Sequence, residues 1–141
     1  PVGETTINAA LAGHFGVPVA LVSGDATTLD EVRRHLPWAV AVETKRSVGY
    51  FAADCASPEM VRALLERGAT EAVERLPETR PFTLEPPIEM EIDTMRTSQA
   101  DMLELVPGMR RTAARTIACC EGDFERIYAA LMAVIYMGAA A

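Results

Sequence analysis

The chain has 141 residues, half of them hydrophobic and 23% charged, a composition that excludes intrinsic disorder as its main state. Its 13 basic and 20 acidic residues give a formal net charge of -7 without a basic stripe, which argues against nucleic acid as the main partner. No apolar run reaches the roughly 18 residues that a membrane-spanning helix needs, so no membrane partner is expected either.

Residues 1–76 predict an α/β part in which helices alternate with apolar strands. The strands have unbroken apolar runs, which is typical of strands buried on both faces of a mostly parallel sheet with flanking helices. The expected elements are a helix over 3–14, a strand over 17–25, a helix over 27–36, a strand over 38–45, a loop over 47–56 and a helix from Ser57-Pro58 to Leu76. For the second helix, Thr27 or Thr28 is the expected N-cap, and Glu31 would complete a capping box if Thr28 is the cap.

The composition changes at residues 77–86, a proline-rich connector. Residues 87–141 then predict an α+β part that is a candidate for oligomer contacts. Its expected elements are an alternating strand over 88–95, a short helix capped by Thr97-Ser98, an antiparallel strand pair within 109–121, and a C-terminal helix that Asp123 caps and that runs towards Met137.

The three cysteines, Cys55, Cys119 and Cys120, predict a reducing environment. An odd count with an adjacent pair does not fit a disulfide framework, and the sequence shows no secretion signal, so a cytoplasmic protein is expected. Cysteines spaced as in zinc knuckles or redox dithiols are absent from the sequence. The adjacent pair is expected on a buried strand, with one thiol on each face.

Three polar residues at predicted strand ends are candidates for a binding site. Asp25 follows the first strand, where ligand crevices of open α/β sheets lie, but an aspartate there is equally suited to forming a turn. Lys45 and Arg46 end the second strand and could meet an anionic group or simply be solvated. His14 and His35 lie near helix ends, where a surface or capping role is expected.

Glu4 stands in the first turn of the first predicted helix, among small apolar residues. The helix dipole favours an acid at this position, and this explanation needs no ligand. A carboxylate oxygen is also a good zinc ligand, and a helix would hold it rigidly. Asn8, one turn later on the same face, could orient that carboxylate or meet a facing backbone group.

The opening segment, "PVGETTINAALAGHFGVPVALVSGD", resembles the corresponding stretch of the DppA-type D-aminopeptidase family of zinc metallopeptidases. The resemblance covers essentially the whole chain, in order, through "LPWAVAVETKRSVGYFAA", "SPEMVRALLERGATEAVERL", "PFTLEPPIEMEIDTMRTSQADMLELVPGM" and "DFERIYAALMAVIY". Members of this family are longer by an N-terminal half of similar size. The resemblance is therefore to the C-terminal half, and the catalytic N-terminal half is expected to be absent from this chain.

The resemblance implies an enzyme that releases N-terminal D-amino acids from short peptides at a centre of two zinc ions. Of the family's metal ligands only the glutamate of the Val-Gly-Glu segment maps onto this chain, at Glu4, and no catalytic residue does. The isolated chain is therefore expected to be inactive. The family also implies a ring-shaped homo-oligomer whose metal sites face an enclosed channel. Two alternatives remain open: a non-catalytic oligomerisation module, and a small-molecule binder that uses Asp25 and Lys45.

Overall fold

The computed structural model describes residues 1–138, which form two compact units, and the boundary between them along the chain lies between Thr83 and Leu84. Each unit is described by itself below. In the described part of the chain, no helix is both long enough and apolar enough to span a membrane.

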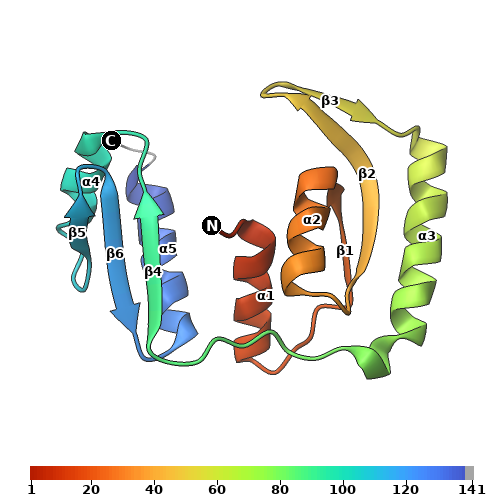
Figure 1. The fold of residues 1–141 in the computed structure, drawn as a ribbon, viewed down its shortest axis with the longest axis horizontal. Helices are drawn as coiled ribbons and strands as arrows, with labels where there is room; N and C mark the ends of the chain where they lie inside the picture. Colours follow the sequence, from red (N-terminus) through yellow and green to blue (C-terminus); the bar gives the residue numbers. More distant parts are fainter. Residues whose placement is uncertain (139–141) are drawn as a thin grey trace. The chain divides into compact units, whose positions relative to one another are not determined.

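The first unit is a three-stranded sheet flanked by helices (Figure 1). The strand order is β1-β2-β3, with β1 and β2 parallel and with β3 antiparallel to β2. The α/β sheet with flanking helices that the apolar strands predict is confirmed, and β3 makes it a mixed sheet. In chain order the elements are α1 (Glu4–His14), β1 (Leu21–Asp25), α2 (Ala26–His35), β2 (Val40–Gly49), β3 (Ala52–Cys55), α3 (Pro58–Glu74) and the short 3-10 helix η1 (Leu76–Glu78).

The two faces of this sheet carry separate apolar clusters because successive strand residues point to opposite sides. Val22 and Ala41 face α1 and α2, whereas Leu21, Val40 and Val42 face α3. The cluster on the α1 and α2 side is built on Ala9, Val32, Leu36 and Trp38, and the cluster on the α3 side on Val40, Val42 and Ala72. Helices therefore cover both faces of β1 and β2, which explains their unbroken apolar runs.

The segment that follows η1 folds back onto the first unit. The guanidinium of Arg80 lies 4.4 Å from the ring centre of Trp38, and the Trp38 indole donates a hydrogen bond to the Val19 carbonyl at 3.2 Å. Phe82 packs against the α1 and α2 cluster and meets the His35 ring edge-on. The backbone of Phe82 also runs so close to Gly13 that only glycine fits there. Part of the predicted connector is thus held against α1 and α2.

The second unit is an antiparallel sheet with the strand order β4-β6-β5 (Figure 1). Its elements are β4 (Ile88–Asp93), α4 (Thr97–Leu103), β5 (Arg110–Ala113), β6 (Thr116–Glu121) and α5 (Phe124–Gly138). Exposed acidic residues alternate with apolar ones along β4, as the sequence pattern predicts. The predicted strand pair is confirmed, because β5 and β6 are antiparallel neighbours. Asp123 is confirmed as the cap of α5, because it accepts a hydrogen bond from the Arg126 amide at 3.0 Å.

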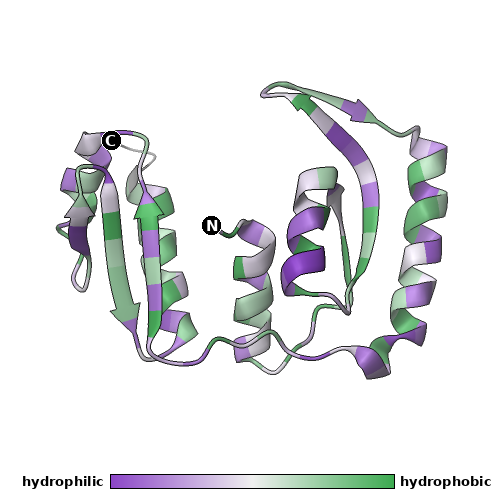
Figure 2. Ribbon diagram, viewed as in Figure 1, coloured by the Kyte–Doolittle hydropathy of each residue, from purple (hydrophilic) through white to green (hydrophobic). Residues whose placement is uncertain are grey.

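The predicted loop over 47–56 is wrong. β2 continues to Gly49 and pairs with β3, so residues 45–55 form an antiparallel hairpin whose turn lies at Tyr50 and Phe51. All the β3 residues are exposed, and neither strand carries an inward-facing apolar row in this region. Without such a row the sequence has no alternation from which a strand could be predicted. Figure 2 shows the hydrophilic stretch that occupies the middle of β2.

Two predicted helix caps are also wrong. Asp25, not Thr27 or Thr28, caps α2, and its carboxylate accepts a hydrogen bond from the Thr28 amide at 2.8 Å. Aspartate is at least as good a cap as threonine, and here it stands one residue before the helix. Thr97 lies inside α4, which begins after Arg96. By contrast, Ser57 caps α3 with Pro58 in the first turn, as predicted.

The cysteine pair lies on β6 with its two thiols on opposite faces, as predicted, but only Cys119 is buried. Cys120 is exposed because one face of the second sheet is open to solvent. Burial raises the pKa of the Cys119 thiol, which makes it less reactive. Cys55, on the hairpin, is exposed.

Candidate functional site

Glu4 is the first residue of α1, and its side chain is exposed. Within the described residues, its carboxylate has neither a hydrogen-bond partner nor an ion-pair partner. The backbone on both sides of Glu4 is anchored, however, because the amides of Gly3 and Thr6 donate hydrogen bonds to Glu31 on α2. Glu4 is therefore a free carboxylate on a rigid helix start, which is the geometry that a metal ligand contributed to a larger site would need.

The start of α1 is held by a residue that the sequence does not single out for this role. Gly3 occupies the N-cap position and has no side chain with which to cap the helix. Instead, one carboxylate oxygen of Glu31, on α2, accepts hydrogen bonds from the amides of Gly3 at 2.8 Å and Thr6 at 3.3 Å, and from the Thr6 hydroxyl. The partners are separated by 25 or more residues, so no local motif reveals the contact.

The environment of Glu31 favours its charged form. Partial burial raises the pKa of Glu31, but the hydrogen bonds from Thr6 and Gly3 outweigh this, so its pKa lies below the ordinary value. His35, one helical turn later on α2, also lowers the pKa of Glu31 through its charge. Glu31 thus acts as an anionic cap for α1 rather than as the capping-box residue of α2 that the sequence predicts.

Asn8 lies one turn after Glu4 on α1, and its side chain is exposed. The described residues provide no hydrogen bond between Asn8 and Glu4. Its role in orienting that carboxylate therefore stays a prediction, which depends on a ligand being present.

Asp25 uses both of its carboxylate oxygens in local structure. One accepts from the Thr28 amide at 2.8 Å, and the other accepts from the Ser47 hydroxyl at 3.0 Å. The hydrogen bonds from Thr28 contribute most to lowering the pKa of Asp25, and Ser47 and the nearby charge of Lys45 add to the effect. The residue connects the start of α2 to β2, which agrees with the turn-forming alternative.

Lys45 and Arg46 do not end their strand, contrary to the prediction, because β2 continues to Gly49. Lys45 lies opposite Cys55 in the hairpin, and Arg46 forms an ion pair with Glu43 at 2.9 Å. Both are exposed. They line a shallow pocket of about 240 Å³ together with Glu43, Thr44, Asp54, Cys55 and Ala56. Its charges are mixed, so it does not form a concentrated anion-binding site.

The chain does not assemble a metal site by itself within residues 1–138. No group of three or more His, Cys, Asp or Glu side chains comes close enough there to bind a metal ion. The two histidines lie in the last turns of α1 and α2, where His14 contacts Phe15 and His35 contacts Phe82. A zinc ion at Glu4 would therefore need ligands from outside these residues.

Comparison with known proteins assigns the chain. Residues 1–133 match the family Peptidase_M55, described as D-aminopeptidase. The D-aminopeptidase of Bacillus subtilis (strain 168) is 28% identical over 133 residues, which are 94% of this chain and 48% of that protein. The structure of the Zn-dependent D-aminopeptidase DppA from Bacillus subtilis, a self-compartmentalizing protease, superimposes with a TM-score of 0.92 and 27% identity, over 98% of this chain and 51% of that one. The chain spans about half the length of these relatives, and it belongs to the D-aminopeptidase family Peptidase_M55.

Proposed function

We propose that this chain forms the C-terminal half of a zinc-dependent D-aminopeptidase and is inactive by itself. The proposal rests on the half-length match to the relatives together with the position of Glu4. The chain matches a Zn-dependent D-aminopeptidase over nearly all of its own length but only half of that protein's. It also presents one unpartnered carboxylate, Glu4, on a fixed helix start.

The donor chemistry of Glu4 fits zinc. Carboxylate oxygen is one of the ligand types that zinc accepts, and three or four such groups complete a site. When bound, zinc supplies an activated water molecule and polarises the carbonyl of the bond to be cleaved. The contribution of this chain is one negatively charged ligand, held by backbone hydrogen bonds of α1. The remaining ligands and the proton-transferring group would come from the other half.

The alternative of a small-molecule binder loses support from the geometry. It needs Asp25 and Lys45 as free polar groups at strand ends. Asp25 already accepts hydrogen bonds from Thr28 and Ser47, and Lys45 lies within a strand.

The substrate class is testable with a joined protein, in which this chain is fused to the half of the family enzyme that it does not span. We expect the joined protein to hydrolyse D-alanyl dipeptides and to lose this activity with a zinc chelator. Matched L-alanyl dipeptides should react far more slowly, and the unjoined chain should hydrolyse neither. Equal rates on the two substrates would contradict the D-aminopeptidase proposal, as would hydrolysis by the unjoined chain.

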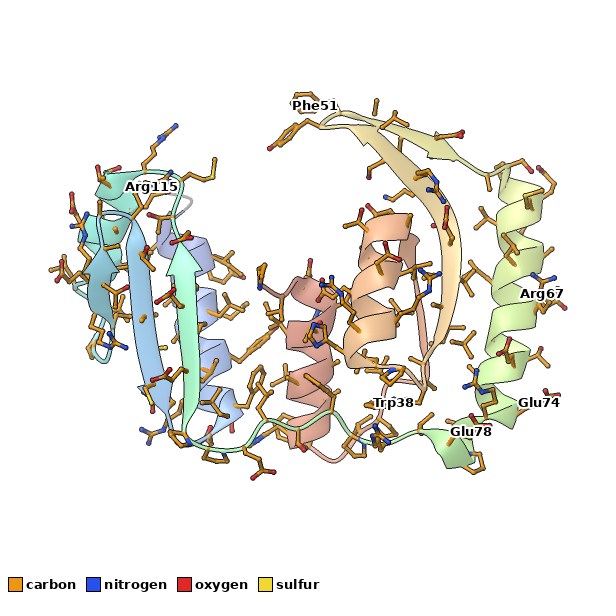
Figure 3. The ribbon with its side chains drawn as sticks, viewed as in Figure 1. Trp38, Phe51, Arg67, Glu74, Glu78 and Arg115 are labelled. Atoms are coloured by element: carbon orange, nitrogen blue, oxygen red, sulfur yellow. The ribbon has the colours of Figure 1, made fainter. Side chains whose placement is uncertain are left out.

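We also propose that the complete protein forms a homo-oligomer through the β2–β3 hairpin, with a second copy of the chain as the partner. The relative DppA is a self-compartmentalizing protease, and compartments of this kind require contacts between copies. Tyr50 and Phe51, at the hairpin turn, are both 96% exposed, with ring centres 4.6 Å apart. Figure 3 shows Phe51 at the tip of the hairpin. Val48, also exposed, extends this apolar tip. Aromatic side chains are enriched at protein interfaces, and they are costly to leave in water.

In the joined protein, the double variant with Tyr50→Ser and Phe51→Ser is expected to form smaller species than the wild-type oligomer. Sedimentation velocity measures the change. Val73→Ser is the matched control, because it removes a 67% exposed apolar side chain from α3 of the same unit, away from the hairpin. An unchanged sedimentation coefficient in the double variant would show that the hairpin is not the contact.

A further inference from the structure

We propose that Glu31 is a positioning residue for Glu4: from α2, it fixes the first turn of α1, and with it the backbone that carries the Glu4 carboxylate. This inference rests on the proposed function, because Glu4 needs a fixed position only as a ligand. Nothing in the comparisons assigns Glu31 a role.

The first step is the unusual cap of α1. The first amides of a helix have no partners within it, and a Ser, Thr, Asp or Asn side chain at the N-cap normally accepts from one of them. Gly3 occupies that position and offers no such group. Glu31 replaces it from another helix, and a single one of its oxygens accepts from the amides of Gly3 and Thr6 and from the Thr6 hydroxyl.

The second step is the position of Glu4 between the anchored residues. Gly3 precedes Glu4 directly and Thr6 follows two residues later, so the backbone of Glu4 is held on both sides. Thr6 is only 5% exposed, which makes the contact part of the packed structure rather than a surface encounter. Helix ends fray when they lack such partners. Without Glu31, the first turn of α1 would lose this anchor, and the backbone that carries Glu4 would be held less firmly.

The third step is the identity of residue 3. A side-chain carbon added to Gly3 would lie 2.6 Å from the second carboxylate oxygen of Glu31. Glycine at this position therefore leaves room for the second carboxylate oxygen of Glu31 in the orientation that the structure shows. The residue that leaves α1 without a cap of its own is thus the same residue that donates its amide to Glu31.

The test compares Glu31→Ala and Glu31→Gln with Asp30→Ala. Asp30 is the neighbouring acid on α2, but it is exposed, and its carboxylate pairs only with Arg33 on its own helix. In the unjoined chain, we expect Glu31→Ala to speed hydrogen exchange of the Thr6 amide about tenfold, as loss of a charge-assisted hydrogen bond implies. Glu31→Gln keeps a neutral acceptor oxygen and should give a smaller increase, and Asp30→Ala none.

In the joined protein, Glu31→Ala should weaken zinc binding by roughly 10- to 100-fold, the usual cost of losing a group that orients a metal ligand. Glu31→Gln should again be intermediate, and Asp30→Ala unchanged. Faster Thr6 exchange with unaltered zinc affinity would overturn the positioning role alone. Unaltered exchange would overturn the contact itself. A joined protein that binds no zinc with Glu31 intact would contradict the proposed function, and the positioning role with it.

Discussion

Gly13→Ala is expected to lower the free energy of unfolding of the first unit by about 3 kcal/mol, the upper part of the usual range for overpacking. Gly13 is a buried position near the end of α1. A side-chain carbon there would overlap the carbonyl oxygen of Phe82 and would lie 2.6 Å from its carbonyl carbon and 2.8 Å from its nitrogen. These are backbone atoms, so no rotamer change relieves the clash, and the segment that holds Phe82 must detach. Chemical denaturation followed by circular dichroism measures the loss.

The sign of this effect separates it from helix propensity. In an ordinary helix position, alanine is more stabilising than glycine by about 1 kcal/mol. Ala69→Gly, at an exposed position of α3, is the matched control and should show that ordinary cost. If Gly13→Ala proves as stable as the wild-type chain, the packing of residues 79–83 against α1 is incorrect.

Glu4→Gln is expected to abolish peptidase activity in the joined protein while the unjoined chain keeps its melting temperature. Changing a group that merely orients a metal ligand lowers metal affinity or activity by about 10- to 100-fold. Replacing the ligand itself should therefore lower kcat/KM by at least about 100-fold. Glutamine has nearly the same shape but offers zinc only a neutral oxygen. The fold should be nearly unaffected, because the Glu4 carboxylate has no partner within the described residues and only its interaction with the helix dipole, about 0.3–1 kcal/mol, is lost.

Glu59→Gln is the matched control for this change. Glu59 also stands exposed in the first turn of a helix, α3, where it pairs with Arg62 at 3.4 Å. If dipole complementation were the only role of such an acid, the two variants would behave alike. Activity that survives Glu4→Gln would remove Glu4 from the proposed metal centre.

The fold could be predicted where the burial of one or both faces of an element sets the spacing of its apolar residues. Val40 and Val42 belong to a strand covered on both faces, and the alternation of β4 records one covered and one open face. Ser57-Pro58 marks the start of α3 through local chemistry alone. The β2–β3 hairpin could not be predicted, because its strands pair through backbone groups and bury few side chains.

The candidate site could be predicted only in part. Glu4 and its helix are visible in the sequence, but the residue type alone favours a helix-dipole role, and only the family resemblance adds a metal. The sequence fits Asp25 equally well to a binding site and to a turn. In the structure, its carboxylate accepts hydrogen bonds from Thr28 and Ser47, which agrees with the turn. Glu31 had a plausible local role in α2, and its actual contact with α1 depends on how two helices pack. Such long-range contacts leave no spacing signal in a single sequence.

Whether Glu4 is a zinc ligand is decided by the zinc content of the joined protein and of its Glu4→Ala variant, measured by mass spectrometry after gel filtration. We expect the joined protein to retain zinc and the variant to lose most of it, while the unjoined chain retains none. Equal zinc in the joined protein and its variant would show that Glu4 is not a ligand, and no zinc in either would show that the protein is not a zinc enzyme.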